Sequence, residues 1–259
     1  MGTPLRIPNQ PIISKNLDLV KRMAREADVV TTATPALASR YAAYARREPL
    51  VLRNAVDMAL YEPDQPREDF RLTSVFYGTH ARLRDYFGAA DDRGRWRGGY
   101  AHSAVTTVGL RTVWVGDEGV GPRPNDFDWV MPYSKDMFAF FRGLGNVHAD
   151  IGVAPLMDDE FNFCKSELHW LDLSAAGVAV IAQRMMGGGP YSVIRDGVDG
   201  LLAKGHQDWL DAVKCLAKDE LRRIDLVAAA RERVAEEYHP RRRAGEWAQA
   251  FALALEGNP

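Results

Sequence analysis

The sequence predicts an α/β fold in which a mostly parallel β-sheet carries helices on its faces. Short apolar runs rich in β-branched residues recur along the chain, for example Leu72–Phe76, Thr112–Val115 and Val178–Ala182. Amphipathic segments of helical length alternate with these runs. Glycines stand directly after some of the runs, where the chain must turn toward the next helix. This alternation is typical of parallel strands joined by helical crossovers.

The N-terminal part predicts a short βα segment followed by a linker. A helix is expected at Leu17–Glu26, because apolar residues recur there on one face, and a short buried strand at Ala27–Thr32 (ADVVTT). Pro35 suits the first turn of a second helix, which runs to about residue 45, and a strand follows at Pro49–Leu52. The segment Tyr61–Asp69 is polar, holds two prolines and reads as a linker.

The middle of the chain predicts further strands and helices by the same criteria. Apolar runs predict strands and apolar spacing on one face predicts helices, with polar glycine-rich stretches as loops. In order, the expected elements are strand Leu72–Phe76, helix Ala81–Phe87, loop Asp91–Gly99, strands Thr112–Val115 and Asp126–Met131, helix Ser134–Arg142 and strand Ile151–Pro155.

The C-terminal part begins with the most informative stretch. Ser166 is placed to cap a helix over Glu167–Ala176, and Gly177 follows in the position that favours glycine. A strand is expected at Val178–Ala182. The remaining expected elements are a helix-like turn at Tyr191–Ile194, amphipathic helices at Trp209–Leu216 and Leu221–Tyr238, and a last helix from Pro240 with Trp247, Phe251 and Leu255 on one face.

Composition excludes several classes of protein. The 259 residues are 46% hydrophobic and carry a net charge of −2, and without a basic stripe nucleic-acid binding is not expected. Two cysteines make neither a disulfide framework nor a metal cluster, and the six histidines lack metal-ligand spacing. The N-terminal residues lack the order of a secretory signal, and the longest apolar run is too short to span a bilayer. Arg241–Arg243 form either a solvated helix start or a contact for lipid or polyphosphate. We expect a cytoplasmic protein with at most peripheral membrane contact.

Two glycine-containing segments and one helix start are the candidate binding residues. Gly78 and Thr79 follow a strand, where backbone N–H groups can approach a phosphate, although glycine there is also ordinary turn chemistry. Lys165 and Ser166 combine an ammonium, a hydroxyl and free backbone donors, which suits a diphosphate. Asp172 lies two helical turns further on and can accept hydrogen bonds from ribose hydroxyls. The alternative is a surface lysine, a capping serine and an exposed aspartate.

The loop Met185–Tyr191 (MMGGGPY) contains three consecutive glycines. Such a loop either permits close approach of a ligand or moves, and the sequence leaves both interpretations open. A serine hydrolase is not indicated, because the Gly-x-Ser-x-Gly pattern is absent.

The stretch FNFCKSELHWLDLSAAGVAVIAQ resembles glycosyltransferases of the GT-B fold, in particular the retaining family-four (group 1) type. VFYGTHARLRD, ADIGVAPL and PYSVIRDGVDGLL are similar to further parts of the C-terminal, donor-binding domain of that family, which is Rossmann-like. ADVVTTATPALASRYAAY and PLVLRNAVD resemble the end of the N-terminal domain and the interdomain linker. The resemblance implies three parts: residues 1–60 as a remnant of the acceptor-side domain with the linker, 61–239 as the nucleotide-sugar-binding domain, and 240–259 as a crossover helix.

The resemblance also implies roles for residues. Gly78, Thr79, Lys165 and Ser166 would bind the donor's diphosphate, Asp172 its ribose, and Gly188, Gly189 and Tyr191 would border the pocket. Lys165 and Asp172 would be the catalytic residues, with Lys165 stabilising the leaving nucleoside diphosphate without a metal or other cofactor. Lys165→Ala should then weaken diphosphate binding by roughly 1.5 to 3 kcal/mol, the scale of a hydrogen bond to a charged group.

The chain also departs from the family pattern. Cys164 stands where many relatives have the first glutamate of a Glu-x7-Glu pair, Asp172 replaces the second, and Arg82 replaces a frequent histidine. Three functions therefore stay open: a retaining hexosyltransferase of polysaccharide or glycan biosynthesis, a non-catalytic nucleotide-sugar-binding module, and an interaction protein without a ligand. With little of the N-terminal domain present, the apolar face of the last helix predicts a homodimer or a partner chain.

Overall fold

The computed structural model describes residues 10–79, 82–90, 96–116 and 127–256. The chain divides into two compact units, Met1–Arg53 with Arg243–Pro259 and Asn54–Arg242. Several predictions fall on residues outside the described ranges. They are the first residues of the N-terminal segment, where a secretory signal was not expected, the helix start at Ala81, most of the loop at Asp91–Gly99 and the strand start at Asp126.

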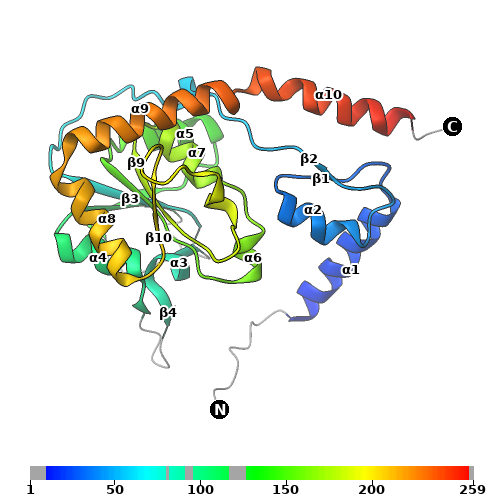
Figure 1. Ribbon diagram of the computed structural model, residues 1–259, viewed down its shortest axis with the longest axis horizontal. Coiled ribbons are helices and arrows are strands. Elements are labelled where there is room, and N and C mark those ends of the chain that lie inside the picture. Colours follow the sequence, from blue (N-terminus) through cyan, green and yellow to red (C-terminus); the bar gives the residue numbers. More distant parts are fainter. Residues whose placement is uncertain (1–9, 80–81, 91–95, 117–126, 257–259) are drawn as a thin grey trace, which may run out of the picture. The chain divides into compact units, whose positions relative to one another are not determined.

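The larger unit is built on one parallel sheet of six strands in the order β10-β9-β8-β3-β6-β7 (Figure 1). All five neighbouring pairs run parallel. Three of the strands, β3, β8 and β9, are buried along their whole length, as strands covered on both faces must be. The bounds are β3 Thr73–Tyr77, β6 Arg111–Gly116, β7 Trp129–Pro132, β8 Ile151–Ala154, β9 Ala179–Gln183 and β10 Leu201–Ala203. The predicted α/β fold class is confirmed.

Helices cover both faces of this sheet (Figure 1). One face packs against α3 (Leu83–Phe87), α4 (Tyr100–Val108) and α8 (His206–Lys218), around the fully buried Trp209. The other face packs against α5 (Met137–Asn146), α7 (Leu168–Ala175), α9 (Glu220–Glu237) and the 3-10 turn η1 (Met58–Tyr61), around Trp170. The sheet therefore separates two apolar cores.

The order of the strands creates a switch point between β3 and β8. From β3 the chain proceeds outward to β6 and β7, and then returns to the opposite side of β3 to form β8. The loops after β3 and β8 consequently leave the sheet toward opposite faces. In open parallel sheets the crevice outside the carboxyl ends of such strands is where ligands bind.

The smaller unit contains α1 (Gln10–Glu26), β1 (Thr31–Thr32), α2 (Pro35–Ala42) and β2 (Leu50–Val51). The two strands pair in parallel, and Pro35 occupies the first turn of α2 as expected. The last helix, α10 (Pro240–Glu256), starts in the larger unit and continues in the smaller one, where Arg47 donates a hydrogen bond to the Leu253 carbonyl at 3.4 Å.

Several elements were not predicted. The part of the predicted loop at Asp91–Gly99 that is described contains β5 (Trp96–Gly98), which pairs with β4 (Gly88–Ala90), so the loop prediction is wrong there. Helix α4 contains serine, threonine and valine, which favour helices only weakly, and packing against α8 decides its conformation. The short helix α6 (Glu160–Phe163) was not predicted either, whereas the 3-10 turn η4 (Pro190–Val193) corresponds to the helix-like turn expected at Tyr191–Ile194. Within the described chain, no helix is long and apolar enough to cross a membrane.

Candidate functional site

A cavity of about 510 Å³ opens beside the carboxyl end of β3, at the switch point of the sheet. Its polar lining includes Tyr61, Gly78, Thr79, Arg82 and Asp172. Its apolar lining comes mainly from α5, η1 and the start of α7, namely Leu60, Tyr133, Met137, Phe140, Phe141 and Leu168. The cavity thus joins a glycine turn and charged groups to an aromatic wall, the combination expected of a site for an organic anion.

The turn after β3 forms the floor of this cavity and is held by β6. The Gly78 N–H donates to the Val115 carbonyl at 3.0 Å, and the Trp114 indole N–H donates to the Gly78 carbonyl at 3.1 Å. Gly78 has φ +146°, a conformation that side chains rarely adopt. A Cβ there would come within 2.9 Å of Cγ of Arg82. Glycine is therefore required both by the backbone and by the close approach of Arg82.

Arg82 contacts His169 in the cavity wall. Nη2 of Arg82 lies 2.7 Å from Nδ1 of His169, so the imidazole must accept this hydrogen bond through an unprotonated nitrogen. Burial, and then the positive charges of Arg82 and Lys165, hold the pKa of His169 well below its ordinary value, although a hydrogen bond with the Tyr77 backbone opposes the shift. His169 is therefore neutral at pH 7, and its ring also packs edge-on against Tyr77 at 4.1 Å between centroids.

Asp85 connects two cations behind the cavity. One carboxylate oxygen accepts hydrogen bonds from the Met157 backbone and the Asn162 amide, each at 3.0 Å. The other oxygen lies 3.4 Å from Nε of Arg82 and 3.7 Å from Nζ of Lys165. The pKa of Lys165 falls to about 8, because the ammonium is desolvated and Arg82 is close. One buried carboxylate is thus shared by two cations, and a net positive charge remains.

Asp172 is buried and accepts hydrogen bonds from two tyrosines. The Tyr61 hydroxyl donates to one carboxylate oxygen at 2.6 Å, and the Tyr77 hydroxyl donates to the other at 2.5 Å. Burial raises the pKa of Asp172 to about 6, although both hydrogen bonds favour the ionised form. Because the same carboxylate meets η1 and β3, it fastens the segment before the sheet to the wall of the cavity.

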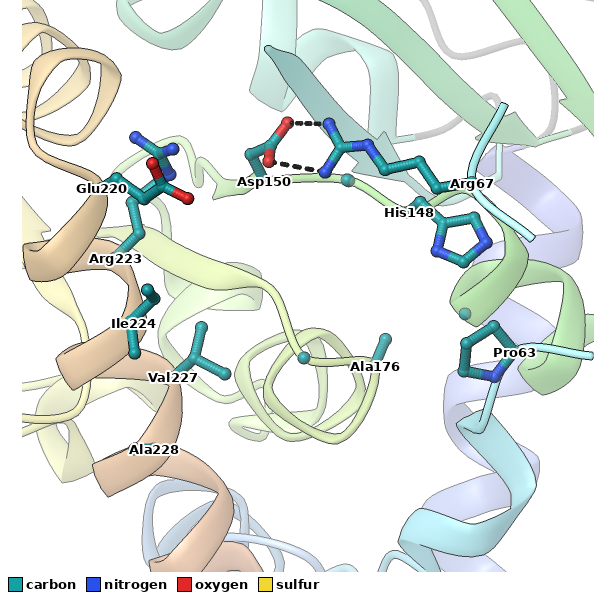
Figure 2. A pocket seen from close by; sticks show the side chains of 13 residues that line it. Pro63, Arg67, His148, Asp150, Ala176, Glu220, Arg223, Ile224, Val227 and Ala228 are labelled. Carbon is teal, nitrogen blue, oxygen red and sulfur yellow. Dashed lines mark hydrogen bonds and ion pairs between the residues drawn. The ribbon is translucent and has the colours of Figure 1, made fainter. Parts of the chain in front are cut away.

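A second hollow, of about 430 Å³, lies at the amino-terminal end of the strands (Figure 2). Arg67 and Asp150 line it and form a two-pronged ion pair, with N···O distances of 2.8 and 3.0 Å (Figure 2). Since both charges satisfy each other, this hollow offers no free charge from that pair. Glu220 and Arg223 also line this hollow, whereas the glycine turn and the pair of cations around Asp85 lie at the carboxyl end of the sheet.

Known proteins share this architecture. No family model matches the chain. A curated relative, D-inositol 3-phosphate glycosyltransferase of Pseudarthrobacter chlorophenolicus, is 32% identical over 125 residues, which cover 48% of this chain and 25% of that protein. Among solved structures, sucrose-phosphate synthase from Thermosynechococcus elongatus has a TM-score of 0.66 at 14% identity, over 95% of this chain and 63% of that one. TarM gives 0.63 at 14% identity, over 92% of this chain and 46% of that one.

The fold is that of the GT-B glycosyltransferases. Anabaena HepE, solved in complex with UDP-glucose, is a further neighbour of the same kind, with a TM-score of 0.64 at 14% identity over 92% of this chain and 67% of that one. A complex of UDP with a mutant of S. aureus TarM is also among them. The chain spans about a quarter of the length of the curated relative and about half that of TarM. The fold predicted from the GT-B resemblance is confirmed.

The GT-B resemblance assigned eight residues to the donor site, and the structure brings some of them together. Gly78, Thr79 and Asp172 line the cavity, whereas Lys165, Ser166, Gly188, Gly189 and Tyr191 are not among its lining residues. Tyr191 reaches the wall indirectly, since its hydroxyl lies 3.4 Å from Nδ1 of His169. Gly188 and Gly189 both have positive φ, in the turn before η4. The roles of all eight residues in donor binding remain predictions.

One local prediction at this site is wrong. The N-cap of α7 is Glu167 and not Ser166, and no side chain caps that helix. The Ser166 hydroxyl instead accepts a hydrogen bond from the Asn54 amide at 2.8 Å. Asn54 belongs to the segment that resembles the GT-B interdomain linker, and it lies 112 residues from Ser166 in the sequence. Because the Ser166 hydroxyl is bound to Asn54, a residue distant in the sequence, it does not cap α7.

Sequence reasoning missed the part that tyrosines play in the cavity. Tyr61 was assigned to a linker, yet it is 2% exposed and meets Asp172. The apolar residues Val56 and Leu60 nearby in the sequence could have indicated that Tyr61 is buried, because a solvated linker rarely contains such residues. Among the described residues, no group of three or more His, Cys, Asp or Glu side chains is placed to hold a metal ion.

Proposed function

We propose that this chain binds a nucleoside-diphosphate sugar in the cavity beside β3 and is the donor-binding half of a glycosyltransferase. One observation carries the proposal: a glycine turn and the guanidinium of Arg82 meet an aromatic wall at the switch point of a GT-B sheet. UDP-glucose in HepE and UDP in TarM are bound by neighbours of the same fold. The proposal extends this ligand class to the present chain.

The two sides of the cavity suit the two ends of such a donor. The Gly78–Thr79 turn and nearby cations favour the diphosphate, because charge-assisted hydrogen bonds to phosphate are among the strongest available. The aromatic wall of Tyr133, Phe140 and Phe141 offers stacking to a flat ring. Each oxygen of Asp172 already accepts one phenol hydroxyl, but a carboxylate oxygen has two lone pairs. Asp172 therefore retains capacity for a ribose hydroxyl.

The proposed reaction is transfer of the sugar from the diphosphate to an acceptor with retention at the anomeric carbon. The bond from the anomeric carbon to the phosphate oxygen breaks, and a bond to the acceptor oxygen forms through an oxocarbenium-like transition state. The acceptor hydroxyl gives its proton to the leaving phosphate oxygen, so that atoms and charge balance. Positive charge near the phosphates, from Arg82 and Lys165, stabilises the negative charge that develops on the leaving group. In this scheme the protein supplies that charge, so no metal cofactor is required.

A second candidate is a nucleotide-sugar-binding module without catalytic activity. The observation that favours it is Cys164, which occupies the place of a glutamate in the resembling family and offers no carboxylate to the donor. Both candidates require donor binding, and only the first requires turnover. A plain interaction protein would require neither.

Calorimetry separates these candidates. The full chain is titrated with UDP, GDP and their glucose and mannose conjugates, with magnesium and again with EDTA. Saturable binding of one nucleotide that persists in EDTA is the expected result. No binding of any of these nucleotides would reject the donor site. With the bound donor in hand, release of free sugar or transfer to an added acceptor distinguishes the enzyme from the module.

The wider setting is also a proposal. We place the chain in cytoplasmic polysaccharide or glycan assembly, where activated sugars are available as donors. A homodimer or a separate chain would supply the surface that faces the acceptor. The apolar side of α10, formed by Trp247, Phe251 and Leu255, supports association, since these side chains are exposed.

A further inference from the structure

We infer that Arg82, rather than Lys165, is the principal cationic ligand of the donor diphosphate, and that Asp85 and His169 position it. This inference rests on the proposed donor site and names the group that binds the phosphates there. It goes beyond the sequence pattern, in which Arg82 was only a departure from a frequent histidine.

Position is the first argument. Arg82 lines the cavity and Lys165 does not. The aliphatic part of Arg82 packs directly on the glycine turn, within 2.9 Å of where a Cβ of Gly78 would stand. The Lys165 ammonium instead lies 4.8 Å from the centre of the exposed Phe161 ring and points at Asp85. A phosphate seated on the Gly78–Thr79 turn would therefore meet the guanidinium first.

Orientation is the second argument. Nε of Arg82 faces Asp85 at 3.4 Å, and Nη2 donates to His169 at 2.7 Å. The Tyr191 hydroxyl is a third hydrogen-bond partner of the Arg82 side chain. Three neighbours thus orient the guanidinium, and since it carries five N–H groups, donors remain for a ligand. A planar fork held in this way suits the oxygens of a phosphate better than a flexible ammonium does.

Charge is the third argument. The side chain of Asp85 is 1% exposed and must be paired, and it is shared between Arg82 and Lys165. His169 accepts a hydrogen bond from Arg82 and stays neutral, so it adds no competing positive charge at that contact. A single carboxylate cannot neutralise two cations. The cluster of Arg82, Lys165 and Asp85 therefore keeps one positive charge, which the guanidinium of Arg82 presents to the cavity beside the carboxylates of Asp57 and Asp172.

The test compares three variants of the full chain. Arg82→Ala should raise the Kd for UDP at least tenfold, and Arg82→Lys should raise it less, because the charge is kept while the fork is lost. Lys165→Ala should raise it less than Arg82→Ala does. Arg84→Ala is the matched control: it removes the same charge two residues further along the chain, but Arg84 is 46% exposed, pairs with Asp159 and does not line the cavity. We expect it to change the Kd less than threefold.

A second measurement separates phosphate contact from damage to the fold. Uridine and inorganic pyrophosphate are titrated into the same proteins. Arg82→Ala should weaken pyrophosphate and UDP together and leave uridine unchanged. An equal loss for uridine, or a Lys165→Ala effect as large as that of Arg82→Ala, would overturn the inference while the donor site stands. If the unaltered chain binds no nucleotide, the proposed function itself fails.

Discussion

The fold strongly affects the charge state of Asp172. Burial raises its pKa from the ordinary 3.8 to about 6, so the folded protein holds this proton more tightly than the unfolded chain does. The stabilising effect of the proton is complete below the unfolded pKa and is lost as pH rises through the folded pKa. Between pH 4 and 6 the free energy of unfolding should therefore fall by about 2 kcal/mol on account of Asp172.

Urea unfolding from pH 4 to 7 checks this expectation. Asp172→Asn does not titrate, so its profile should lack the fall that the unaltered protein shows. Asp211→Asn, which replaces an exposed aspartate on α8, should keep it. Identical profiles for the unaltered protein and Asp172→Asn would contradict the burial of this charge.

Spacing along a helix could predict which residues lie near α7, but not what they contact. Lys165 and Asp172 are seven residues apart in the sequence and were expected to meet one ligand. In the structure Lys165 faces Asp85, and Asp172 faces Tyr61 and Tyr77. These tyrosines precede Asp172 by 111 and 95 residues. Such pairings follow from the tertiary fold, which local periodicity does not encode.

At the scale of elements, the buried strands were the most predictable part. β3, β8 and β9 are short runs of apolar residues bounded by turns, and the sequence places each within one residue of its observed ends. The sequence did not predict η1 and α4, which lack a strong pattern of their own. Tyr61 in η1 is buried and donates a hydrogen bond to the distant Asp172, and α4 is stabilised by its packing against α8.

The turn from β3 to α3 gives a prediction at this scale. Gly78→Ala should strain a backbone at φ +146° and push against Arg82, so both stability and UDP affinity should fall. The cost in stability should be about 1 to 2 kcal/mol. Gly109→Ala is a matched control, since Gly109 has φ +78° but open space around its Cβ position.

Thermal melts and UDP titrations of both variants provide the measurement. Both should melt at lower temperature than the unaltered chain, and only Gly78→Ala should bind UDP more weakly, by at least tenfold. Equal affinities for the two variants would mean that the turn does not carry the phosphate site. A stable Gly78→Ala protein with unaltered UDP affinity would contradict the close approach of Arg82.

At the scale of the whole molecule, the exposed face of α10 decides whether the chain acts alone. Trp247, Phe251 and Leu255 recur at every fourth residue and are 43%, 64% and 77% exposed. The rings of Trp247 and Phe251 lie 6.1 Å apart, so the face is continuous. Apolar side chains that gather on one helix in this way usually mark an interface, because covering them removes apolar surface from water.

We therefore expect the purified chain to associate, and light scattering across a concentration series should show a mass above 28.9 kDa that rises with concentration. Phe251→Ser should shift this equilibrium toward the monomer. Leu221→Ser is the matched control, because Leu221 is 73% exposed on a different helix, α9, and its loss should leave the mass unchanged. A chain that stays monomeric at all concentrations forms no homodimer, and the α10 face would then have to serve a different partner chain.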